Sequence, residues 1–474
     1  MFRDKCLKYK IKYFNFNNNN LKGGVQDVLR NPNDRGIVLA AVKKNGLALR
    51  YASEELKKDE EIVLTAVSNY AVALQYAYPT LKNNKEIVLA AVQQNGMALE
   101  HAHFTLKNDR GIVMAAVTNN GDALRYASEK LKKDEEIVLT AVSNYTDALK
   151  HAHEGLKKDR KFILSAVKKN SWILKELHED LKNDSEIVLA AVTQNGLALQ
   201  YAYPTLKNYR GIVLAAVKKN GLALQYAYTT LKEEREIVLA AVQQNGFALQ
   251  YAHFKLKKDR GIVLAAVEKN GLALKHASEE LKEDKKFILE AIKKNGEAFK
   301  LARSRDDSKF VLDAVTKNGM VLEYAYEKLK EEREIVLAAV EQNGMALEHA
   351  HFRLKKDRGI VLAAVQQNGL ALKYTPDEFK RDDKIVLFAV KQNGLALQFA
   401  SDILKFNYEI VKNAVNQNGL AYQYASDYMK NKSEIVSAAV RQNSKVIELL
   451  SEEIRPSIER KLEDENKIYI TRGR

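Results

Sequence analysis

The sequence predicts an all-α protein, an α-solenoid in which about 17 short two-helix repeats of 25 residues form a superhelical array. Three observations lead to this prediction. An Asn-Gly pair recurs at intervals of 25 residues or a multiple, with one interval of 23. A six-residue apolar run such as IVLAAV precedes each pair, and helix-capping residues precede the run. A second apolar segment such as LALQYA follows the glycine at once.

The glycine of the pair marks the repeat along almost the whole chain. It stands at Gly46, Gly96, Gly121, Gly196, Gly221, Gly246, Gly271, Gly296, Gly319, Gly344, Gly369, Gly394 and Gly419. Degenerate copies place Ala71, Thr146, Ser171 and Ser444 at the same position, which brings the count to 17. A fixed period of this size is typical of solenoids and other repeat arrays.

The apolar run is predicted to be a helix of about ten residues, because both of its ends carry helix signals. Before the run stands an Asp or Asn, such as Asp59, whose side chain can accept hydrogen bonds from the free backbone N–H groups. The glutamates that follow suit the positive helix end. After the run come Lys or Gln and then Asn-Gly, as in residues 43–46. We expect Gly46 to end the helix in the left-handed conformation.

The segment after the glycine is predicted to be a second short helix. Its small residues Ala198 and Ala202 lie four apart, so another helix can approach that face closely. A one-turn helical piece follows, with a capping Ser or Thr at its start or a proline just inside it. The capping residues are Ser53, Ser128, Ser278 and Thr375, and the prolines are Pro79, Pro204 and Pro376.

A leucine-rich repeat has a similar period but a different pattern of apolar residues. Starting from Leu39, Lys44 falls where that fold needs an inward apolar residue, and Leu47 falls where it needs Asn. We therefore reject this fold. Because an isolated ten-residue helix is marginal in water, each repeat must bury its apolar residues against the next.

The chain is predicted to have three parts. Residues 1–30 form a basic leader with a low-complexity asparagine segment, residues 31–454 form the repeat array, and residues 455–474 form a polar capping helix and tail. The 23-residue repeat lacks two residues and the leucine that the preceding repeat supplies as Leu281. We expect a kink there, near residues 303–308.

Composition limits the classes of function. The net charge is +15, of which residues 1–30 carry +5 and residues 455–474 carry +2, so the array carries +8. This is a weak charge density for a surface that tracks phosphates. The single cysteine, Cys6, excludes an intrachain disulfide and a cysteine-based metal site. The apolar runs are too short to span a membrane and no signal peptide is present, so we expect an intracellular protein.

Histidine pairs such as His101 and His103 resemble metal ligands, but on a helix two residues that are two apart point about 200° away from each other. No metal or other cofactor is predicted. In many repeats an aromatic or imidazole ring occupies the second position of these pairs. We call these residues the ladder residues. They are Tyr78, His103, His153, Tyr203, Tyr228, His253, Tyr326 and His351. They have two interpretations: the rings stack nucleic-acid bases, or they pack between neighbouring repeats.

Other polar residues also have structural interpretations. We expect Lys57, Lys58 and their equivalents to form a solvated edge, and Trp172 to replace a core Leu or Met. Since every polar residue type recurs at equivalent positions, no unique catalytic set is present and no enzyme is predicted. Function is expected at the positions that vary between copies, and examples are Thr193, Gln194, Gln200 and Tyr203.

The repeat EREIVLAAVQQNGFALQYAH, residues 234–253, resembles a helical repeat family catalogued only as a domain of unknown function, and the resemblance extends over about nine-tenths of the chain. The segment KCLKYKIKYF, followed by LKGG, is similar to the leader of many mimivirus-type giant-virus proteins, in which Tyr is usual at the position of Cys6. These resemblances imply a viral protein of the infected host cell or the virion.

Two functions follow as hypotheses. The first is a non-catalytic scaffold that binds a protein partner, and the second is a nucleic-acid-binding array that uses the ladder residues and the basic termini. A third hypothesis concerns the leader, where Gly23 and Gly24 would form the processing site of a Gly-Gly-specific protease.

Overall fold

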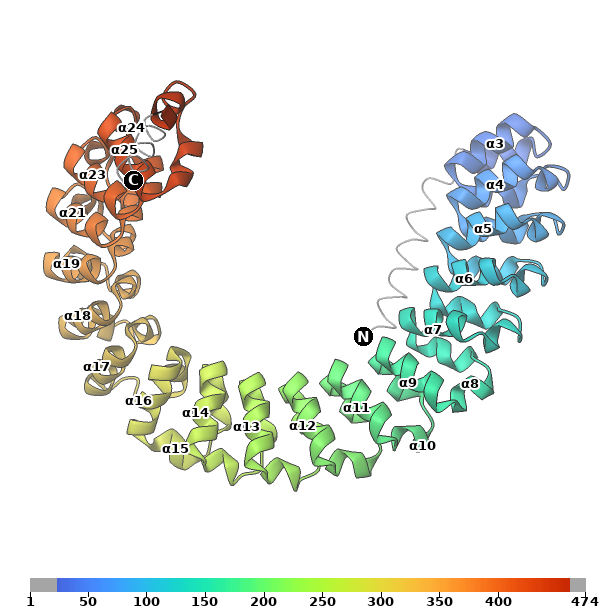
Figure 1. Cartoon of the computed structure of the whole chain (residues 1–474), viewed down its shortest axis with the longest axis horizontal. Coiled ribbons are helices and arrows are strands. Elements are labelled where there is room, and N and C mark those ends of the chain that lie inside the picture. The colour runs from blue at the N-terminus through green and yellow to red at the C-terminus, as the bar shows by residue number, and fades with distance from the viewer. Residues whose placement is uncertain (1–23, 461–474) are drawn as a thin grey trace, which may run out of the picture. The chain divides into compact units, whose positions relative to one another are not determined.

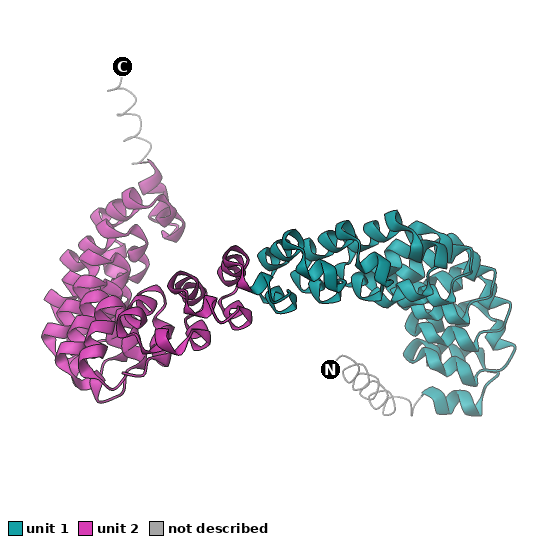
Figure 2. Cartoon of the chain, turned by 90° about the horizontal axis from the view of Figure 1, so that it is seen from below, with its two compact units in different colours: residues 1–232 teal, residues 233–474 magenta. Residues whose placement is uncertain are grey.

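The structure is a computed structural model, and it describes residues 24–460 of the 474-residue chain. The chain divides into two compact units, Met1–Lys232 and Glu233–Arg474 (Figure 2). Residues 24–460 form short helices in tandem and no strand, which confirms the all-α repeat array. The leader through Gly23 and the tail from residue 461 lie outside the described residues, so the outer boundaries predicted for the array stay predictions.

The first element of every repeat is a ten-residue α-helix, as predicted. These helices are α3 (Arg35–Lys44), α4 (Glu60–Asn69), α5 (Lys85–Gln94), α6 (Arg110–Asn119), α7 (Glu135–Asn144), α9 (Arg160–Lys169), α11 (Ser185–Gln194) and α12 (Arg210–Lys219) in the first unit. In the second unit they are α13 (Arg235–Gln244), α14 (Arg260–Lys269), α16 (Lys285–Lys294), α17 (Ser308–Lys317), α18 (Arg333–Gln342), α19 (Arg358–Gln367), α21 (Asp383–Gln392), α23 (Tyr408–Gln417) and α25 (Ser433–Gln442).

The second element is a six-residue helix in every repeat, and it is a 3₁₀ helix. In the first unit these are η1 (Gly46–Tyr51), η3 (Ala71–Tyr76), η5 (Gly96–His101), η7 (Gly121–Tyr126), η9 (Thr146–His151), η10 (Ser171–Glu176), η11 (Gly196–Tyr201) and η13 (Gly221–Tyr226). In the second unit they are η15 (Gly246–Tyr251), η17 (Gly271–His276), η18 (Gly296–Leu301), η19 (Gly319–Tyr324), η21 (Gly344–His349), η23 (Gly369–Tyr374), η24 (Gly394–Phe399), η25 (Gly419–Tyr424) and η26 (Ser444–Leu449).

The third element is a single helical turn that we call the third piece. It is η2 (Leu56–Lys58), η4 (Leu81–Asn83), η6 (Leu106–Asn108), η8 (Leu131–Lys133), α8 (Glu154–Lys158), α10 (Glu179–Lys182), η12 (Pro204–Asn208), η14 (Leu231–Glu233), η16 (Leu256–Lys258), α15 (Glu279–Glu283), η20 (Leu329–Glu331), η22 (Leu354–Lys356), α20 (Asp377–Lys380), α22 (Asp402–Lys405) or α24 (Asp427–Lys430). The 23-residue repeat has no helical third piece. A further helix, α2 (Gly24–Arg30), packs against α3 at the start of the array.

Within each unit the α-helices stack side by side in one row and the 3₁₀ helices in a second row (Figure 1). Most 3₁₀ helices pack against the α-helix of their own repeat and against the next α-helix of the same unit, as η1 does against α3 and α4. A repeat is therefore completed by its neighbour, which is the stacking that the short helices require.

The core lies between the two rows and has a similar composition in each repeat. In α4 the buried side chains are Ile62, Val63, Ala66 and Val67, and η3 adds Ala73 and Leu74. Burial of a Val, Leu or Ile side chain contributes about 1.5–3 kcal/mol relative to exposure. These contributions stabilise helices that would be marginal alone.

The helix starts agree with the prediction. The Oδ1 atom of Asp59 accepts a hydrogen bond from the N–H of Ile62 at 3.1 Å, and Asp34 does the same for Ile37 at 2.9 Å. Serine caps the third piece of several repeats, because the N–H groups of Leu131, Leu281 and Met429 donate to Ser128, Ser278 and Ser426. The same bond from Leu56 to Ser53 is 3.5 Å long.

The predicted left-handed glycine is wrong. No residue within 24–460 has a positive φ, and Asn45 ends α3 in an extended conformation with φ −150° and ψ 107°. Its Oδ1 atom accepts from the N–H of Leu47 at 3.0 Å, so this asparagine begins the 3₁₀ helix. A β-carbon added to Gly46 would lie 2.2 Å from the carbonyl oxygen of Ala66 in the next repeat. Glycine is thus needed for close approach of the backbones rather than for φ.

Thr375 does not cap the third piece, contrary to the prediction. It takes the position that alanine has in the other repeats, it is buried, and its hydroxyl donates to the carbonyl oxygen of Leu372 at 2.9 Å. The N-cap residue of α20 is Pro376, which offers no side-chain hydrogen bond. The threonine was assigned to the wrong position because it immediately precedes a proline.

Candidate binding surface

The ladder residues lie at the start of the third piece in their repeats. Tyr228 and Tyr326 are 48% and 53% exposed. The other six are half-buried, namely Tyr78, His103, His153, Tyr203, His253 and His351. The rings therefore do not form one continuous exposed edge.

The backbone at the ladder position joins neighbouring repeats. The N–H of Tyr78 donates to the carbonyl oxygen of Lys57 at 3.0 Å, and the N–H of His103 donates to that of Lys82 at 2.9 Å. The same hydrogen bond forms from Ser128 to Lys107, His153 to Lys132, Tyr203 to Lys182, Tyr228 to Lys207, Ser278 to Lys257 and His351 to Lys330. This position therefore has a stacking role whatever side chain it carries.

The histidine rings of the ladder also make local contacts. The Nδ1 atom of His153 accepts from the N–H of Gly155 at 3.1 Å and caps α8. The Nε2 atoms of His253 and His351 lie 3.3 and 3.4 Å from carboxylate oxygens of Glu233 and Glu331. These contacts favour packing over base stacking as the role of the rings.

No metal centre is formed by the histidine pairs in the part of the chain that the structure describes, because no three His, Cys, Asp or Glu residues there lie close enough to hold an ion. Burial lowers the pKa of His101, His151 and His276, which keeps these rings neutral in the neutral pH range. The pairs at residues 101 and 103 and at residues 151 and 153 therefore each combine a half-buried neutral ring with a ladder ring.

The lysines of the third piece are not one solvated edge. The Nζ atoms of Lys82 and Lys207 donate to the carbonyl oxygens of Gln75 and Gln200, each at 2.7 Å. Burial lowers the pKa of Lys82, Lys207, Lys232, Lys257 and Lys355. Only the second lysine of each pair, such as Lys58, is exposed as predicted.

A row of ion pairs joins the starts of successive α-helices. The Nε atom of Arg35 lies 2.7 Å from Oδ2 of Asp59, and that of Arg160 lies 2.6 Å from Oδ2 of Asp184. Equivalent pairs are Lys85–Asp109, Arg110–Asp134, Arg235–Asp259, Arg260–Asp284, Lys285–Asp307, Arg333–Asp357 and Arg358–Asp382. Because the aspartate also caps its helix, one carboxylate both stabilises its own helix start and forms an ion pair with the preceding repeat.

Side-chain amides join the other ends of the α-helices. The Oε1 atom of Gln392 accepts from the N–H of Gly369 at 2.6 Å, and its Nε2 atom donates to the carbonyl oxygen of Gln367 at 3.2 Å. Gln367 and Gln417 make the same pair of bonds one repeat to either side. Gln194, a position at which function was expected, likewise donates to the carbonyl oxygen of Lys168, and Thr193 bonds within its own helix.

A set of side chains that are not part of the joining contacts described above lies along the row of 3₁₀ helices. They are the first, fourth and fifth residues after the glycine of each repeat, and we call them the 3₁₀ surface. In the first unit the three positions hold, for example, Trp172, Lys175 and Glu176, then Leu197, Gln200 and Tyr201. Trp172 is 41% exposed on this surface, so the prediction that it replaces a core residue is wrong.

Contacts across repeats make the 3₁₀ surface continuous within each unit. The rings of Trp172 and Tyr201 meet edge to face with centroids 6.1 Å apart, and those of Phe247 and His276 do so at 6.2 Å. The guanidinium of Arg50 lies 5.7 Å from the centroid of the Tyr51 ring and 5.9 Å from that of Tyr76. Apart from Gln200, the sequence reasoning did not select these positions, although their variation between copies was the available signal.

The charges of the 3₁₀ surface cancel in each unit. In the first unit it carries Arg50, Arg125, Lys150 and Lys175 against Glu100, Asp122, Asp147 and Glu176. In the second unit it carries Lys275, Lys300, Lys373 and Lys445 against Glu297, Glu323, Glu348 and Glu448. Four cations and four carboxylates leave no net field that would attract a phosphate backbone.

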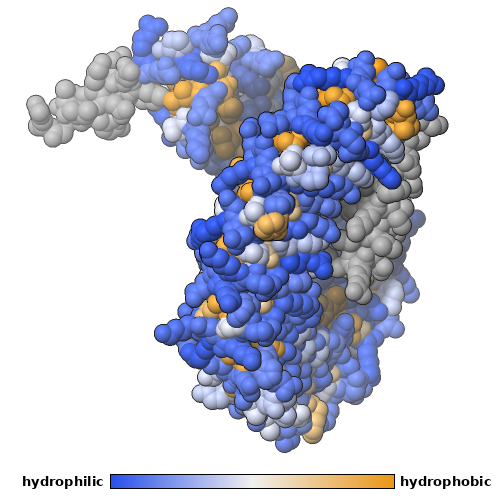
Figure 3. All heavy atoms as spheres, turned by 90° about the vertical axis from the view of Figure 1, so that its right-hand side faces the viewer, coloured by the Kyte–Doolittle hydropathy of each residue, from blue (hydrophilic) through white to orange (hydrophobic). Residues whose placement is uncertain are grey.

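The face drawn in Figure 3 shows hydrophobic residues as small islands among hydrophilic ones. Phe104, Phe254 and Phe352 are well exposed, and each ring packs on the ladder histidine before it with centroids 4.3–4.4 Å apart. No helix formed by residues 24–460 combines the length and the apolar character that a membrane crossing needs. Gly24, the described half of the predicted processing site, is the first residue of α2, and cleavage stays a prediction.

A family model described as "Domain of unknown function (DUF4116)" matches the chain nine times between residues 34 and 455. The matches cover residues 34–82, 59–107, 109–157, 159–207, 209–257, 259–305, 307–355, 357–405 and 407–455. Each begins at the residue before a ten-residue α-helix and spans two of the 25-residue repeats. A comparison with curated proteins finds no match.

Proposed function

Because the chain belongs to this repeat family, whose function is not assigned, we propose a function from the geometry: a non-catalytic scaffold that binds a protein partner along the 3₁₀ surface. The observation that supports the proposal is the division of labour between positions. The contacts that join repeats lie at the two ends of the α-helices and at the third pieces, whereas the 3₁₀ surface leaves side chains such as Tyr51 and Trp172 exposed. Aromatic residues, Met and Arg, which this surface carries, are enriched in protein interfaces.

The charge balance weighs against the nucleic-acid alternative. A nucleic-acid-binding array needs a basic surface that follows the phosphates, and each unit has equal numbers of opposite charges on its 3₁₀ surface. The ladder residues, which the alternative uses for base stacking, make packing and capping contacts in several repeats. The basic termini lie largely outside the described residues and do not enter this argument.

The proposal is tested by capture with a matched pair of variants. Trp172 on the 3₁₀ surface and Leu189 on the α-helical row are 41% and 42% exposed in neighbouring repeats of the same unit. The full chain, Trp172→Ser and Leu189→Ser serve as bait in extracts of the cells that produce the protein, and bound proteins are identified by mass spectrometry. We expect a protein that the full chain and Leu189→Ser retain and Trp172→Ser loses. Capture of no protein above background, or equal capture by both variants, contradicts the proposal.

The setting of the proposed scaffold is the infected host cell or the virion. The similarity of residues 5–24 to giant-virus leaders supports this part of the proposal. Proteomics of purified virions beside fractions of infected cells tests it, and absence of the protein from both contradicts it.

A further inference from the structure

The repeat between Gly296 and Gly319 lacks a side chain that its neighbours bury. Four residues separate Ala302 from Asp307, whereas six separate Ala277 from Asp284 in the preceding repeat. Those six residues include Leu281 in α15, and the repeat that follows has Leu329 at the same position. Both leucines are buried, at 7% and 5% exposure. At this position the short repeat has Ser304, whose carbonyl oxygen accepts from the N–H of Asp307 but whose side chain is small and polar.

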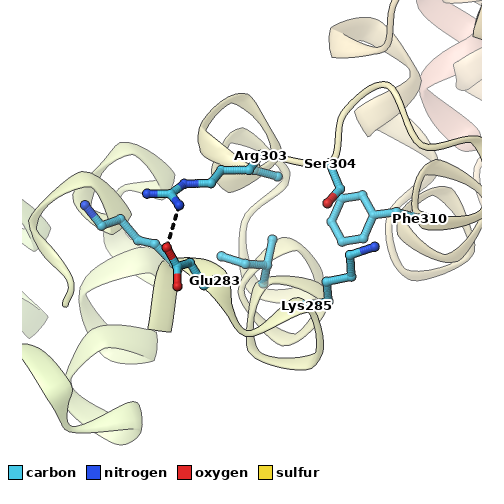
Figure 4. Close-up of a pocket in the computed structure, with 8 residues that line it drawn as sticks. Glu283, Lys285, Arg303, Ser304 and Phe310 are labelled. Atoms are coloured by element: carbon cyan, nitrogen blue, oxygen red, sulfur yellow. Dashed lines mark hydrogen bonds and ion pairs between the residues drawn. The ribbon is translucent and has the colours of Figure 1, made fainter. Parts of the chain in front are cut away.

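A hollow of about 200 Å³ lies at this place in the second unit (Figure 4). It is lined by Lys282, Glu283, Lys285, Ile288, Ala302, Arg303, Ser304 and Phe310. These residues come from the preceding third piece, from α16, from the segment after η18 and from α17. In the repeat register this is the place that the third piece of the short repeat would cover.

The floor of the hollow is apolar. Ile288, Ala302 and Phe310 form it, and all three are buried. Phe310 stands where most repeats have Ile, as Phe162 and Phe287 also do, and its ring stacks on that of Phe299 with centroids 6.3 Å apart. The Phe310 ring forms one wall of the hollow.

The charged rim is neutralised within the chain. The Nη2 atom of Arg303 lies 2.9 Å from Glu279, its Nη1 atom lies 2.5 Å from Glu283, and Lys285 lies 2.9 Å from Asp307. Figure 4 shows Arg303 reaching toward Glu283 on one side of the hollow, with Lys285 and Phe310 on the other. Lys285 and Arg303 are therefore already paired, and the three apolar side chains of the floor, which are only 2–5% exposed, are what the hollow offers to a side chain that enters it.

The size of the hollow limits what it can hold. Sites for cofactors and drug-sized ligands have roughly 300–1,000 Å³. A hollow of about 200 Å³ instead suits one side chain that an interacting protein inserts as an anchor. The other repeats show which anchor fits, because a leucine on a single helical turn occupies this place in the preceding and the following repeat.

We infer that the hollow of the short repeat is a docking site for a leucine that a partner protein presents on one helical turn. The partner's turn replaces the third piece that the short repeat lacks, so the array supplies every surface of the contact except the leucine. This inference rests on the proposed function, since it requires a protein partner, and it names the side chain by which that partner is anchored.

The probe is a fluorescent peptide with the sequence of residues 276–284, which contains the chain's own third piece. Its control carries Leu281→Ala. We expect the full chain to bind the first peptide at least about tenfold more tightly than the second, because a buried leucine side chain supplies most of the contact. Fluorescence anisotropy gives both dissociation constants.

A graft variant tests whether the peptide enters the hollow. In it residues 303–306 are replaced by the sequence of residues 278–283, which restores the missing leucine. We expect it to lose at least about tenfold of the peptide affinity while its helical circular dichroism is unchanged. Ser304→Phe, which narrows the hollow from its rim, is expected to weaken binding as well.

Equal affinity for the two peptides, no binding of either, or full binding by both variants overturns the inference. The outcome is separate from that of the proposed function. A captured partner that the graft variant still binds leaves the proposed function standing and sinks only the inference. If the peptide binds in a leucine-dependent way but no partner is captured, the hollow binds a leucine as inferred and the proposed scaffold function is contradicted.

Discussion

Arg35 and Asp59 join two successive repeats at the starts of their α-helices, with Nε and Oδ2 2.7 Å apart. The same carboxylate caps α4 through the N–H of Ile62. Capping and stacking thus depend on one side chain, and this relationship recurs in about half of the repeats. The first two predictions follow from it.

We expect Asp109→Ala to lower the free energy of unfolding by about 1–2 kcal/mol. The substitution removes the cap of α6 and the partner of Lys85. Denaturant unfolding followed by circular dichroism measures the change. Glu55→Ala removes a carboxylate whose side chain is 81% exposed and is the control. Equal stability of the two variants contradicts the structural role of Asp109.

Stability should fall in acid because the capping aspartates are held ionised. A hydrogen bond from Arg35 keeps the pKa of Asp59 low, and hydrogen bonds from Lys85 and Arg358 do so for Asp109 and Asp382. A depressed folded pKa means that the unfolded chain binds more protons below about pH 4. The contribution is complete above the unfolded pKa and is lost as the pH falls through the folded pKa.

The measurement for this prediction is the melting temperature between about pH 6 and pH 2. A variant with Asp59, Asp109 and Asp382 all changed to Asn should melt at a lower temperature at neutral pH and show a smaller decrease in acid. If the melting temperatures of the two proteins fall in parallel, these carboxylates are not the source of the acid sensitivity.

Gly46→Ala should destabilise the array by about 1–3 kcal/mol, because the new methyl group would meet the carbonyl oxygen of Ala66 and force the next repeat to move. Gly36→Ala in the same repeat is the matched control, since its methyl group would lie 3.4 Å from the nearest atom. We expect Gly36→Ala to be neutral or stabilising by up to about 1 kcal/mol. Thermal unfolding distinguishes the two, and a similar loss in both variants contradicts the close-approach explanation.

Gln392→Ala should cost about 1–3 kcal/mol of stability, because it leaves the buried N–H of Gly369 without its acceptor. Gln366→Ala, an exposed glutamine in the preceding repeat, should change stability by less than about 0.5 kcal/mol. Hydrogen exchange at Gly369 gives a local readout, which should accelerate only in Gln392→Ala. Unchanged exchange there excludes the amide contact as a stabilising bond.

The balanced charges of the 3₁₀ surface predict weak nucleic-acid binding. At physiological salt we expect single-stranded RNA and duplex DNA to bind the full chain no more tightly than about 10⁻⁶ M, the range of non-specific binding. Titration at several salt concentrations checks this. Submicromolar affinity with a steep salt dependence would favour the nucleic-acid alternative instead.

Local signals in the sequence predicted much of the fold. The aspartate or asparagine before most apolar runs and the period of 25 were sufficient for the ten-residue helices, because capping and burial depend on residues close in the chain. The role of Gly46 was not predictable in this way, since the carbonyl that excludes a β-carbon belongs to the next repeat. The same reason applies to Lys82, whose burial depends on tertiary packing.

The candidate site was less predictable than the fold. The ladder residues attracted attention as aromatic side chains at a regular position, yet His153 caps a helix and Tyr78 bonds backward through its N–H group. The 3₁₀ surface was not predicted because residue types at equivalent positions differ, as Asp122, Trp172 and Leu197 do, and such differences do not form a motif. Locating the hollow required two things: the two-residue deletion in the sequence, and the structure, which shows what surrounds the missing leucine.

The amide contact at Asn368-Gly369 also affects how the protein ages. In an Asn-Gly pair the glycine nitrogen can attack the asparagine side chain, which releases ammonia and leaves a succinimide that hydrolyses to aspartate or isoaspartate. Here the glycine N–H is held by Gln392, and the Oδ1 atom of Asn368 accepts from the N–H of Leu370 at 3.0 Å. Both reacting groups are engaged elsewhere while the repeats are stacked. The Asn-Gly pair at residues 368–369 is therefore protected from deamidation by the neighbouring repeat.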